Sequence, residues 1–257
     1  MREVLMVIPT ADKIAKHFTA YYQPIVDLNT GAVAGFEALA RVVKKNGSIA
    51  TAGAVIEKIE RRSDTLKALI RTILVSIRRD MVPLFERHPH FYVSVNIPPA
   101  ILGSGQILPM VEALELTPYL HRIVCEVTER QALTHLGRSA LEGARRSGMS
   151  VAIDDFGTGH SGLMQIVGLD FDILKIDHSL IDTILTNQTA ARMLRGIVAS
   201  PPRCVYTQWR KESRAGKRRF SCAPPGLIAA KAGFGVRPSR GRWHHGYWIR
   251  DTRGDCG

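Results

Sequence analysis

The stretch Ser150–Asp177, SVAIDDFGTGHSGLMQIVGLDFDILKID, places charged side chains at the ends of two short apolar runs. The first run ends in Asp154 and Asp155, and the second leads into Lys175 and Asp177. Adjacent carboxylates repel each other, and the repulsion is relieved when a divalent cation binds against them. Taken alone, the pair indicates a metal site and an Asp-Asp turn with a helix cap about equally well. Groups elsewhere in the chain decide between these two readings.

The composition is that of a globular domain. The chain has 257 residues, 45% of them hydrophobic, which is enough for one sizeable core or one barrel. No apolar run reaches the roughly 18 residues of a membrane span, and the first residues lack the small-residue cleavage site of a signal peptide. We therefore expect a cytoplasmic protein that does not interact with a membrane.

The net charge of +12 is concentrated at the C-terminal end. Residues 1–200 carry 22 Lys and Arg against 20 Asp and Glu, whereas residues 201–257 carry 13 against 3. All three Trp also lie in that tail. This shift predicts one domain over residues 1–200 and a basic tail over residues 201–257 that is non-native or disordered. The basic and aromatic residues of the tail follow no known nucleic-acid-binding pattern, so a nucleic acid is not the partner that we expect.

Strands and helices are predicted to alternate along most of residues 21–198. Tyr21–Asp27 and Ala32–Arg41 flank an Asn-Thr-Gly turn and predict a hairpin, and the apolar stripe from Leu66 to Phe85 predicts one long helix. Further along, the predicted strands are Phe91–Asn96, Ile123–Val127, Val151–Asp155 and Ile173–Asp177, and the predicted helices are Leu108–Leu116, Leu136–Arg146 and Gln188–Val198. Such alternation predicts a parallel sheet.

Polar side chains follow the apolar part of four successive strands. They are Asn96, Glu126, Asp154 with Asp155, and Lys175. A (β/α) barrel gathers its functional groups at the carboxyl ends of its strands, whereas an open doubly wound sheet gathers them at one switch point. The distribution therefore favours a barrel. Glu37 and Arg41 share one face of the second hairpin strand, so they could point into the same pocket.

Five motifs in order carry a resemblance to a known family. They are FEALAR (36–41), VNIPP (95–99), EVTER (126–130), DDFGTG (154–159) and KID (175–177). From about Tyr21 to about Ser200 the chain closely resembles the EAL-domain family of cyclic di-GMP phosphodiesterases. The resemblance implies a modified TIM (β/α)8 barrel that hydrolyses cyclic di-GMP to linear pGpG with two Mg²⁺ or Mn²⁺ ions.

The resemblance also implies roles for individual residues. The residues that would hold the metals are Glu37, Asn96, Glu126, Asp154 and Asp155, and the catalytic groups would be Lys175, Glu37 and Asp155. Lys175 would orient the attacking water. Gln23, Arg41 and Asp177 would serve the substrate side of the site. Glu129 would stabilise the loop that contains Gly157 and Gly159, and the loop after Asp155 would take part in a homodimer.

Each role has a purely structural alternative. Glu37 with Arg41 could form a salt bridge at the barrel mouth, Glu126 with Glu129 could be a solvated pair, and Lys175 could face solvent. Asn96 and the two glycines of the loop could simply form turns. Because all these groups fall at strand ends that share one rim, every one of these structural alternatives would have to be true at the same time. The loop also departs from the family at His160 and Gly162, where a tyrosine and a serine are usual.

The resemblance ends near Ser200. The family continues with a strand that ends in AEGVE and a later QGY or QGW motif, and neither is present here. Shifted by one base, permitted codons for Thr207–Arg214 can read TVAEGVE, and those for Leu227–Gly235 can read DCGQGWL. We therefore hypothesise a frame shift that removes the last two barrel strands, replaces them with an irregular tail and deprives the second metal site of a carboxylate.

These observations leave two main functional hypotheses. The first is a cyclic di-GMP phosphodiesterase domain with impaired or absent activity. The alternative is a non-catalytic module that binds cyclic di-GMP or a protein partner. Nucleic-acid binding by the tail is a weaker third.

Overall fold

The computed structural model describes residues 9–27, 30–158, 163–166, 168–177 and 180, together with four short strands beyond residue 200. The strands are β1 (Phe18–Asp27), β2 (Val33–Val43), β3 (Ile49–Thr51), β4 (Tyr92–Asn96), β5 (Ile123–Thr128), β6 (Ser150–Phe156), β7 (Ile173–Asp177), β8 (Arg203–Thr207), β9 (Leu227–Lys231), β10 (Gly241–His244) and β11 (Tyr247–Arg250). The helices are α1 (Ala11–His17), α2 (Gly53–Glu60), α3 (Ser63–Asp80), α4 (Val82–Arg87), α5 (Pro99–Leu102), α6 (Ile107–Ala113), the 3₁₀ helix η1 (Thr117–Arg122), α7 (Glu129–Ala132), α8 (His135–Arg146) and α9 (Leu163–Ile166).

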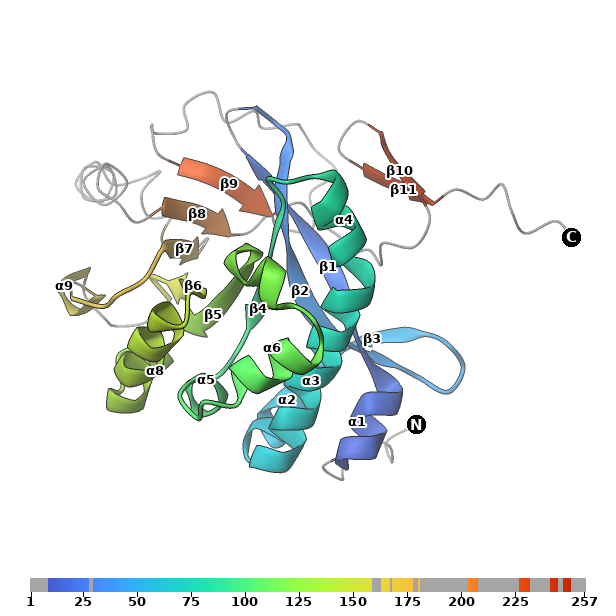
Figure 1. Cartoon of the computed structure of the whole chain (residues 1–257), viewed down its shortest axis with the longest axis horizontal. Helices are drawn as coiled ribbons and strands as arrows, with labels where there is room; N and C mark the ends of the chain where they lie inside the picture. The colour runs from blue at the N-terminus through green and yellow to red at the C-terminus, as the bar shows by residue number, and fades with distance from the viewer. Residues whose placement is uncertain are drawn as a thin grey trace, which may run out of the picture.

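The main sheet closes on itself to form a barrel (Figure 1). Going round the ring, the order is β1, β2, β4, β5, β6, β7, β8, β9 and back to β1. The strands from β2 to β9 run parallel to their neighbours in the ring, whereas β1 runs antiparallel to both β2 and β9. The prediction of a modified α/β barrel is confirmed. Because parallel strands end on the same rim, the polar groups at their carboxyl ends are brought together.

The predicted hairpin is confirmed as the β1–β2 pair. Asp27 makes the turn, since its backbone carbonyl accepts a hydrogen bond from the N–H of Gly31 and its carboxylate accepts one from the N–H of Thr30. Gly31 has a positive φ of 70°, which glycine adopts without strain. The register places Gln23 directly opposite Glu37 across the pair. The hairpin thus brings a predicted substrate residue beside a predicted metal ligand.

The prediction of one long helix from Leu66 to Phe85 is wrong in one respect, because the helix breaks at Met81. The first part, α3, ends at Asp80, and α4 begins at Val82 with Pro83 in its first turn. Proline has no N–H and clashes with the preceding turn, so it starts a helix rather than continuing one. The apolar stripe itself is buried on both sides of the break.

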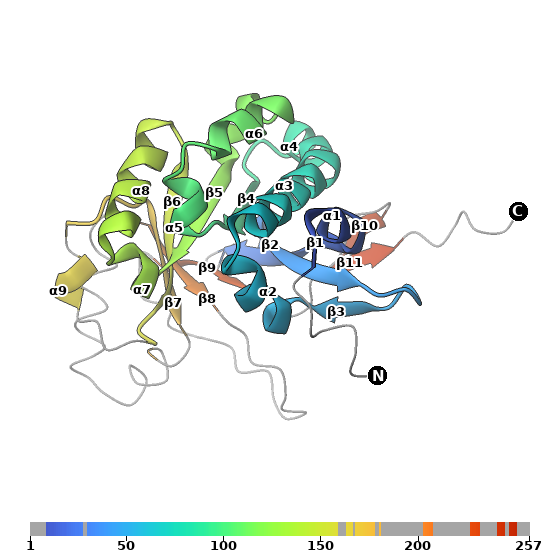
Figure 2. The ribbon, with the colours of Figure 1, turned by 90° about the horizontal axis from the view of Figure 1, so that it is seen from below.

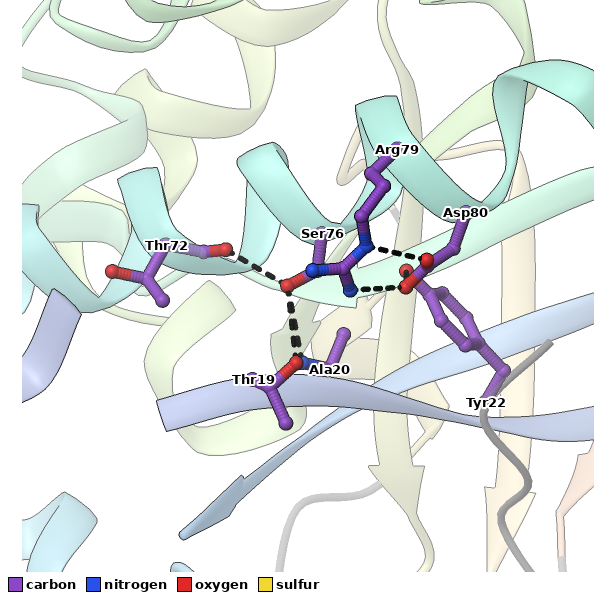
Figure 3. Close-up of polar contacts among 7 residues, drawn as sticks. All are labelled: Thr19, Ala20, Tyr22, Thr72, Ser76, Arg79 and Asp80. Atoms are coloured by element: carbon purple, nitrogen blue, oxygen red, sulfur yellow. Dashed lines mark hydrogen bonds and ion pairs between the residues drawn. The ribbon is translucent and has the colours of Figure 1, made fainter. Parts of the chain in front are cut away.

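Helix α3 makes polar contacts with the first half of β1 (Figure 3). The buried Ser76 hydroxyl accepts a hydrogen bond from the N–H of Ala20 at 3.3 Å and lies 3.4 Å from the hydroxyl of Thr19. It donates in turn to the carbonyl of Thr72. One turn further on, the Tyr22 hydroxyl donates to Asp80 at 3.4 Å. This end of β1 pairs with β2 alone among the described strands, so α3 supplies partners that a second strand would otherwise give.

Two segments of the tail complete the ring. Residues of β8 pair with β7 from Ile173 to Asp177, and β9 pairs with β8 and with β1. Short segments of the tail therefore stand where the two missing strands were expected, and the non-native or disordered character of the tail stays a prediction. Backbone hydrogen bonds between strands require an extended chain but no particular side chains. The edges of β7 and β1 can therefore pair with extended segments of the tail. The predicted helix Gln188–Val198 lies outside the described residues.

The described helices pack around the outside of the barrel. Figure 2 shows α3, α6 and α8 on the same side of the strands. Their buried side chains join those of the strands in one core that includes Ile73, Ile77, Val93, Leu141 and Ile153. No helix among the described residues is long and apolar enough to cross a membrane.

Candidate metal centre at the carboxyl ends of the strands

Four charged side chains from four strands meet inside the barrel. Glu37 comes from β2, Glu126 from β5, Asp154 from β6 and Lys175 from β7. Their exposed fractions are 2%, 1%, 6% and 2% respectively. Each follows an apolar run that anchors its strand in the core, so the charged group is carried to a fixed place on the rim. The readings of Glu126 as a solvated carboxylate and of Lys175 as a solvent-facing lysine are therefore wrong.

The three carboxylates surround the lysine ammonium. Lys175 Nζ lies 2.6 Å from Glu126 Oε2, 2.7 Å from Asp154 Oδ2 and 3.6 Å from Glu37 Oε2. One oxygen of each carboxylate lies within 4.8 Å of one oxygen of each of the other two. Three buried carboxylates at this spacing cost much solvation and repel one another, so they require positive charge between them.

The environment fixes the charge of Lys175. Burial by itself lowers the pKa of the Lys175 ammonium, but Glu126, Glu37 and Asp154 outweigh burial and raise that pKa above its ordinary value. Lys175 is therefore a cation within this cluster of carboxylates. A cationic ammonium can donate hydrogen bonds and stabilise negative charge, but it cannot accept a proton from water.

Asn96 and Ser94 lie on the same face of β4, next to this cluster. The Asn96 amide donates to Glu126 Oε2 at 3.3 Å, which orients that carboxylate. Asn96 is exposed, so it stands at the mouth of the site. Ser94, two residues earlier, is 2% exposed, and its hydroxyl has no hydrogen-bond partner among the described residues. Sequence reasoning missed Ser94. Its alternation with Asn96 on the strand could have indicated an inward-facing hydroxyl.

The two adjacent aspartates point to different places. The pairing of β6 with β7 is irregular between Ile153 and Phe156, which is where the aspartates lie. Asp155 has a positive φ of 57° and is exposed, whereas Asp154 is buried in the cluster. The Asp155 N–H donates to Asp154 Oδ1, and its carbonyl accepts from the Thr158 hydroxyl. A strand irregularity of this kind re-aims side chains at a site. Asp155 does not belong to the group of three carboxylates, and its predicted metal role stays a prediction.

The loop after Asp155 is held by Glu129, the first residue of α7. Glu129 is buried, and its Oε2 accepts a hydrogen bond from the N–H of Gly157 at 3.2 Å. Gly157 has a φ of +99°, and a Cβ there would lie 2.7 Å from Leu180 Cβ. Glycine is therefore required at this position by both backbone and space. Gly159, the second loop glycine of the prediction, lies outside the described residues.

The three predicted substrate residues lie on β1, β2 and β7. Gln23 is half-buried opposite Glu37, and Asp177 is buried at the end of β7, two residues beyond Lys175. The half-buried Arg41 donates from Nη1 to the carbonyl of its neighbour Ala40 at 3.0 Å. A phosphate contact by Arg41 would need this guanidinium to turn away from the backbone.

The chemistry of the cluster fits a hard divalent cation. Mg²⁺ and Mn²⁺ prefer carboxylate and amide oxygens, and the described rim offers three such carboxylates with an asparagine beside them. The thiol of Cys125 does not compete, because it lies against Met149 on the other face of β5, and burial, aided by Glu126, raises the pKa of Cys125 to about 12. Glu37, Glu126, Asp154 and Asn96 are thus the residues that would hold such an ion.

Known proteins match most of the chain. The EAL domain family profile matches residues 10–200. The probable cyclic di-GMP phosphodiesterase PdeB of Escherichia coli K12 is 33% identical over 169 residues, which is 64% of this chain and 32% of PdeB. The chain therefore spans about a third of the length of this curated relative.

Solved structures share the fold. A complex of the PaMucR phosphodiesterase with c-di-GMP superposes with a TM-score of 0.67 at 22% identity, covering 86% of this chain and 92% of that one. The EAL enzyme Bd1971, solved with cAMP and cyclic di-GMP, gives a TM-score of 0.65 at 25% identity and covers 84% of this chain and 60% of the other. Since the family profile spans most of the chain and ends where the basic tail begins, the chain belongs to the EAL-domain family.

Proposed function

We propose that this chain is a cyclic di-GMP phosphodiesterase domain that hydrolyses cyclic di-GMP to linear pGpG, with impaired activity. The observation that carries the proposal is the buried cluster of Glu37, Glu126 and Asp154 around Lys175 at the carboxyl ends of the strands. The relative PdeB is named for this activity, and Bd1971 was solved with cyclic di-GMP bound. These two proteins support the choice of substrate.

In the proposed reaction, water attacks one of the two phosphodiesters and one P–O bond breaks, which leaves a 5′ phosphate and a free 3′ hydroxyl. Divalent cations, when bound, supply Lewis acidity for the phosphoryl oxygens and the water. Lys175 donates a hydrogen bond to the water and stabilises its ionised form. A carboxylate of the site, rather than the Lys175 ammonium, would accept the proton that leaves the water. Gln23 and Arg41 would contact the guanine and a phosphate.

The tail is the reason for expecting impaired activity. The residues of β8 read RCVYT and those of β9 read LIAAK, so neither strand brings a carboxylate to the rim. We propose that the first metal site is complete and that the second, built around Asp155, lacks an acidic ligand. Loss of a ligand or of a general base commonly lowers a rate by about 10²–10⁴-fold.

The test measures binding and turnover together on the full chain. Calorimetry with cyclic di-GMP, with and without Mg²⁺, is combined with chromatographic detection of pGpG in the presence of Mn²⁺. We expect binding heat and slow formation of pGpG that Asp154→Asn abolishes. Turnover equal to that of an intact EAL relative would contradict the impairment. Absence of both heat and product would contradict the proposed function.

A second function follows from the same absence of acidic residues on β8 and β9. A chain that binds cyclic di-GMP without making pGpG would be a binding module, in which Gln23, Arg41 and Glu37 retain the nucleotide. Binding heat with no product over days separates this function from slow hydrolysis.

In either case the expected compartment is the cytoplasm, and a homodimer through the loop after Asp155 remains a prediction that sedimentation can test.

A further inference from the structure

The lysine occupies the place that a metal ion would need. Lys175 Nζ contacts Glu126 Oε2 and Asp154 Oδ2 at 2.6 and 2.7 Å, and Glu37 Oε2 lies 3.6 Å away on the third side. These three residues are also those whose oxygens are spaced to hold a cation. These short contacts between an ammonium and buried carboxylates are ion pairs.

Burial makes the lysine indispensable to the cluster when no other cation is bound. The ammonium and the Glu126 carboxylate are 2% and 0% exposed in their side chains, so water screens their interaction little. Three buried carboxylates without a cation among them would have to protonate or move apart. Lys175 supplies that cation from within the chain.

A divalent ion and an ammonium compete for these oxygens at close range, because like charges in a buried site repel each other. We infer that Lys175 is the internal counter-cation that keeps the carboxylate cluster assembled, and that a divalent cation binds there only as the Lys175 ammonium withdraws. Lys175 thus lowers the affinity of the cluster for metal while it preserves the arrangement of the ligands. This inference rests on the proposed metal-dependent function.

The experiment uses the full chain and Mn²⁺ alone. Thermal unfolding in EDTA reports the counter-cation role, and the signal of free Mn²⁺ in electron paramagnetic resonance reports affinity. Lys175→Met is expected to lower the unfolding temperature in EDTA by about 10 °C or more. It is expected to bind Mn²⁺ at least about tenfold more tightly than the parent chain and to be stabilised more by it. Lys175→Arg should resemble the parent in EDTA, and the exposed Lys16→Met should change neither readout.

If Lys175→Met does not fold in EDTA, the double variant Lys175→Met with Glu126→Gln decides the matter. Removing one carboxylate together with the lysine restores much of the charge balance, so this chain should fold where the single variant does not. Failure of the double variant to regain stability would overturn the inference, as would unchanged or weaker Mn²⁺ binding by Lys175→Met. If neither the parent chain nor the Lys175→Met chain binds Mn²⁺, the competition between Lys175 and the metal is disproved, and so is the metal site. Hydrolysis of cyclic di-GMP is measured separately, so failure of the proposed function is distinguished from failure of this inference.

Discussion

Glu126 contacts both the lysine ammonium and the asparagine amide of the site. It forms the shortest ion pair with Lys175, at 2.6 Å, and accepts the Asn96 amide at 3.3 Å through the same oxygen. Asn96 and Glu126 are register partners on β4 and β5, so the barrel itself places them side by side. At the residue scale, the arrangement of the site therefore depends on strand register rather than on a flexible loop.

Glu126→Gln tests this dependence. The amide keeps the shape of the side chain but loses the charge, so we expect Mn²⁺ affinity to fall about 10–100-fold. Electron paramagnetic resonance of free Mn²⁺ measures the change. Glu142→Gln on α8 is the matched control, because Glu142 is exposed and its ion-pair partner is the exposed Arg146. Equal affinity for both variants would show that Glu126 is not a ligand.

Asp155 offers a second test at the same scale. Its φ of 57° suits asparagine almost as well as aspartate and suits a β-branched residue badly. We expect Asp155→Asn to leave the free energy of unfolding unchanged and Asp155→Val to lower it by about 1–2 kcal/mol or more. Urea denaturation measures both. Similar stabilities for Asn and Val at this position would contradict the strained conformation.

Much of the site could be predicted at the residue scale. The places of Glu126, Asp154 and Lys175 follow from strand ends that share a rim, and the FEALAR motif adds Glu37 from the middle of its strand. The different directions of Asp154 and Asp155 could not be foreseen, because they arise from an irregularity in the pairing of β6 with β7. Ser94 was missed because its only signal is its alternation with Asn96 on β4, and a lone serine inside an apolar strand is easily passed over.

At the scale of elements, the contact between α3 and β1 illustrates what sequence leaves open. The apolar stripe predicts that α3 packs on the barrel, and the structure places Ile73 and Ile77 in the core. The polar seam of Ser76, Thr19 and Ala20 within that interface depends on this end of β1, which pairs with β2 and with no other strand that the structure describes. Periodicity does not reveal where a neighbouring strand stops.

Ser76→Ala tests the seam. The substitution removes the acceptor for the buried N–H of Ala20, so we expect the free energy of unfolding to fall by about 1–3 kcal/mol. Ser139→Ala, on the exposed face of α8, measures the helix-propensity gain of the same change and serves as the control. Chemical denaturation of both variants gives the difference. If Ser76→Ala is as stable as Ser139→Ala, the seam contributes nothing.

At the scale of the whole molecule, the tail has two opposite effects on the barrel. Its segments β8 and β9 complete the ring through backbone pairing with β7 and β1, although the sequence predicts a change of character near Ser200. The same segments bring no carboxylate to the rim. Composition detects the missing side-chain chemistry but not backbone pairing, because any extended segment can hydrogen-bond to an open strand edge. The barrel can therefore close through backbone pairing whatever side chains the tail carries.

Truncation separates these two effects. A chain ending at residue 235 keeps β8 and β9 and removes the β10–β11 hairpin, so we expect it to unfold at the temperature of the full chain and to bind Mn²⁺ equally well. A chain ending at residue 200 exposes the edges of β7 and β1 together with the adjoining core, so we expect it to aggregate or to melt at least about 10 °C lower. Scanning fluorimetry and size-exclusion chromatography measure both chains. A monomeric 1–200 chain as stable as the 1–235 chain would mean that the tail does not close the barrel, and the site would then be built by the first 200 residues alone.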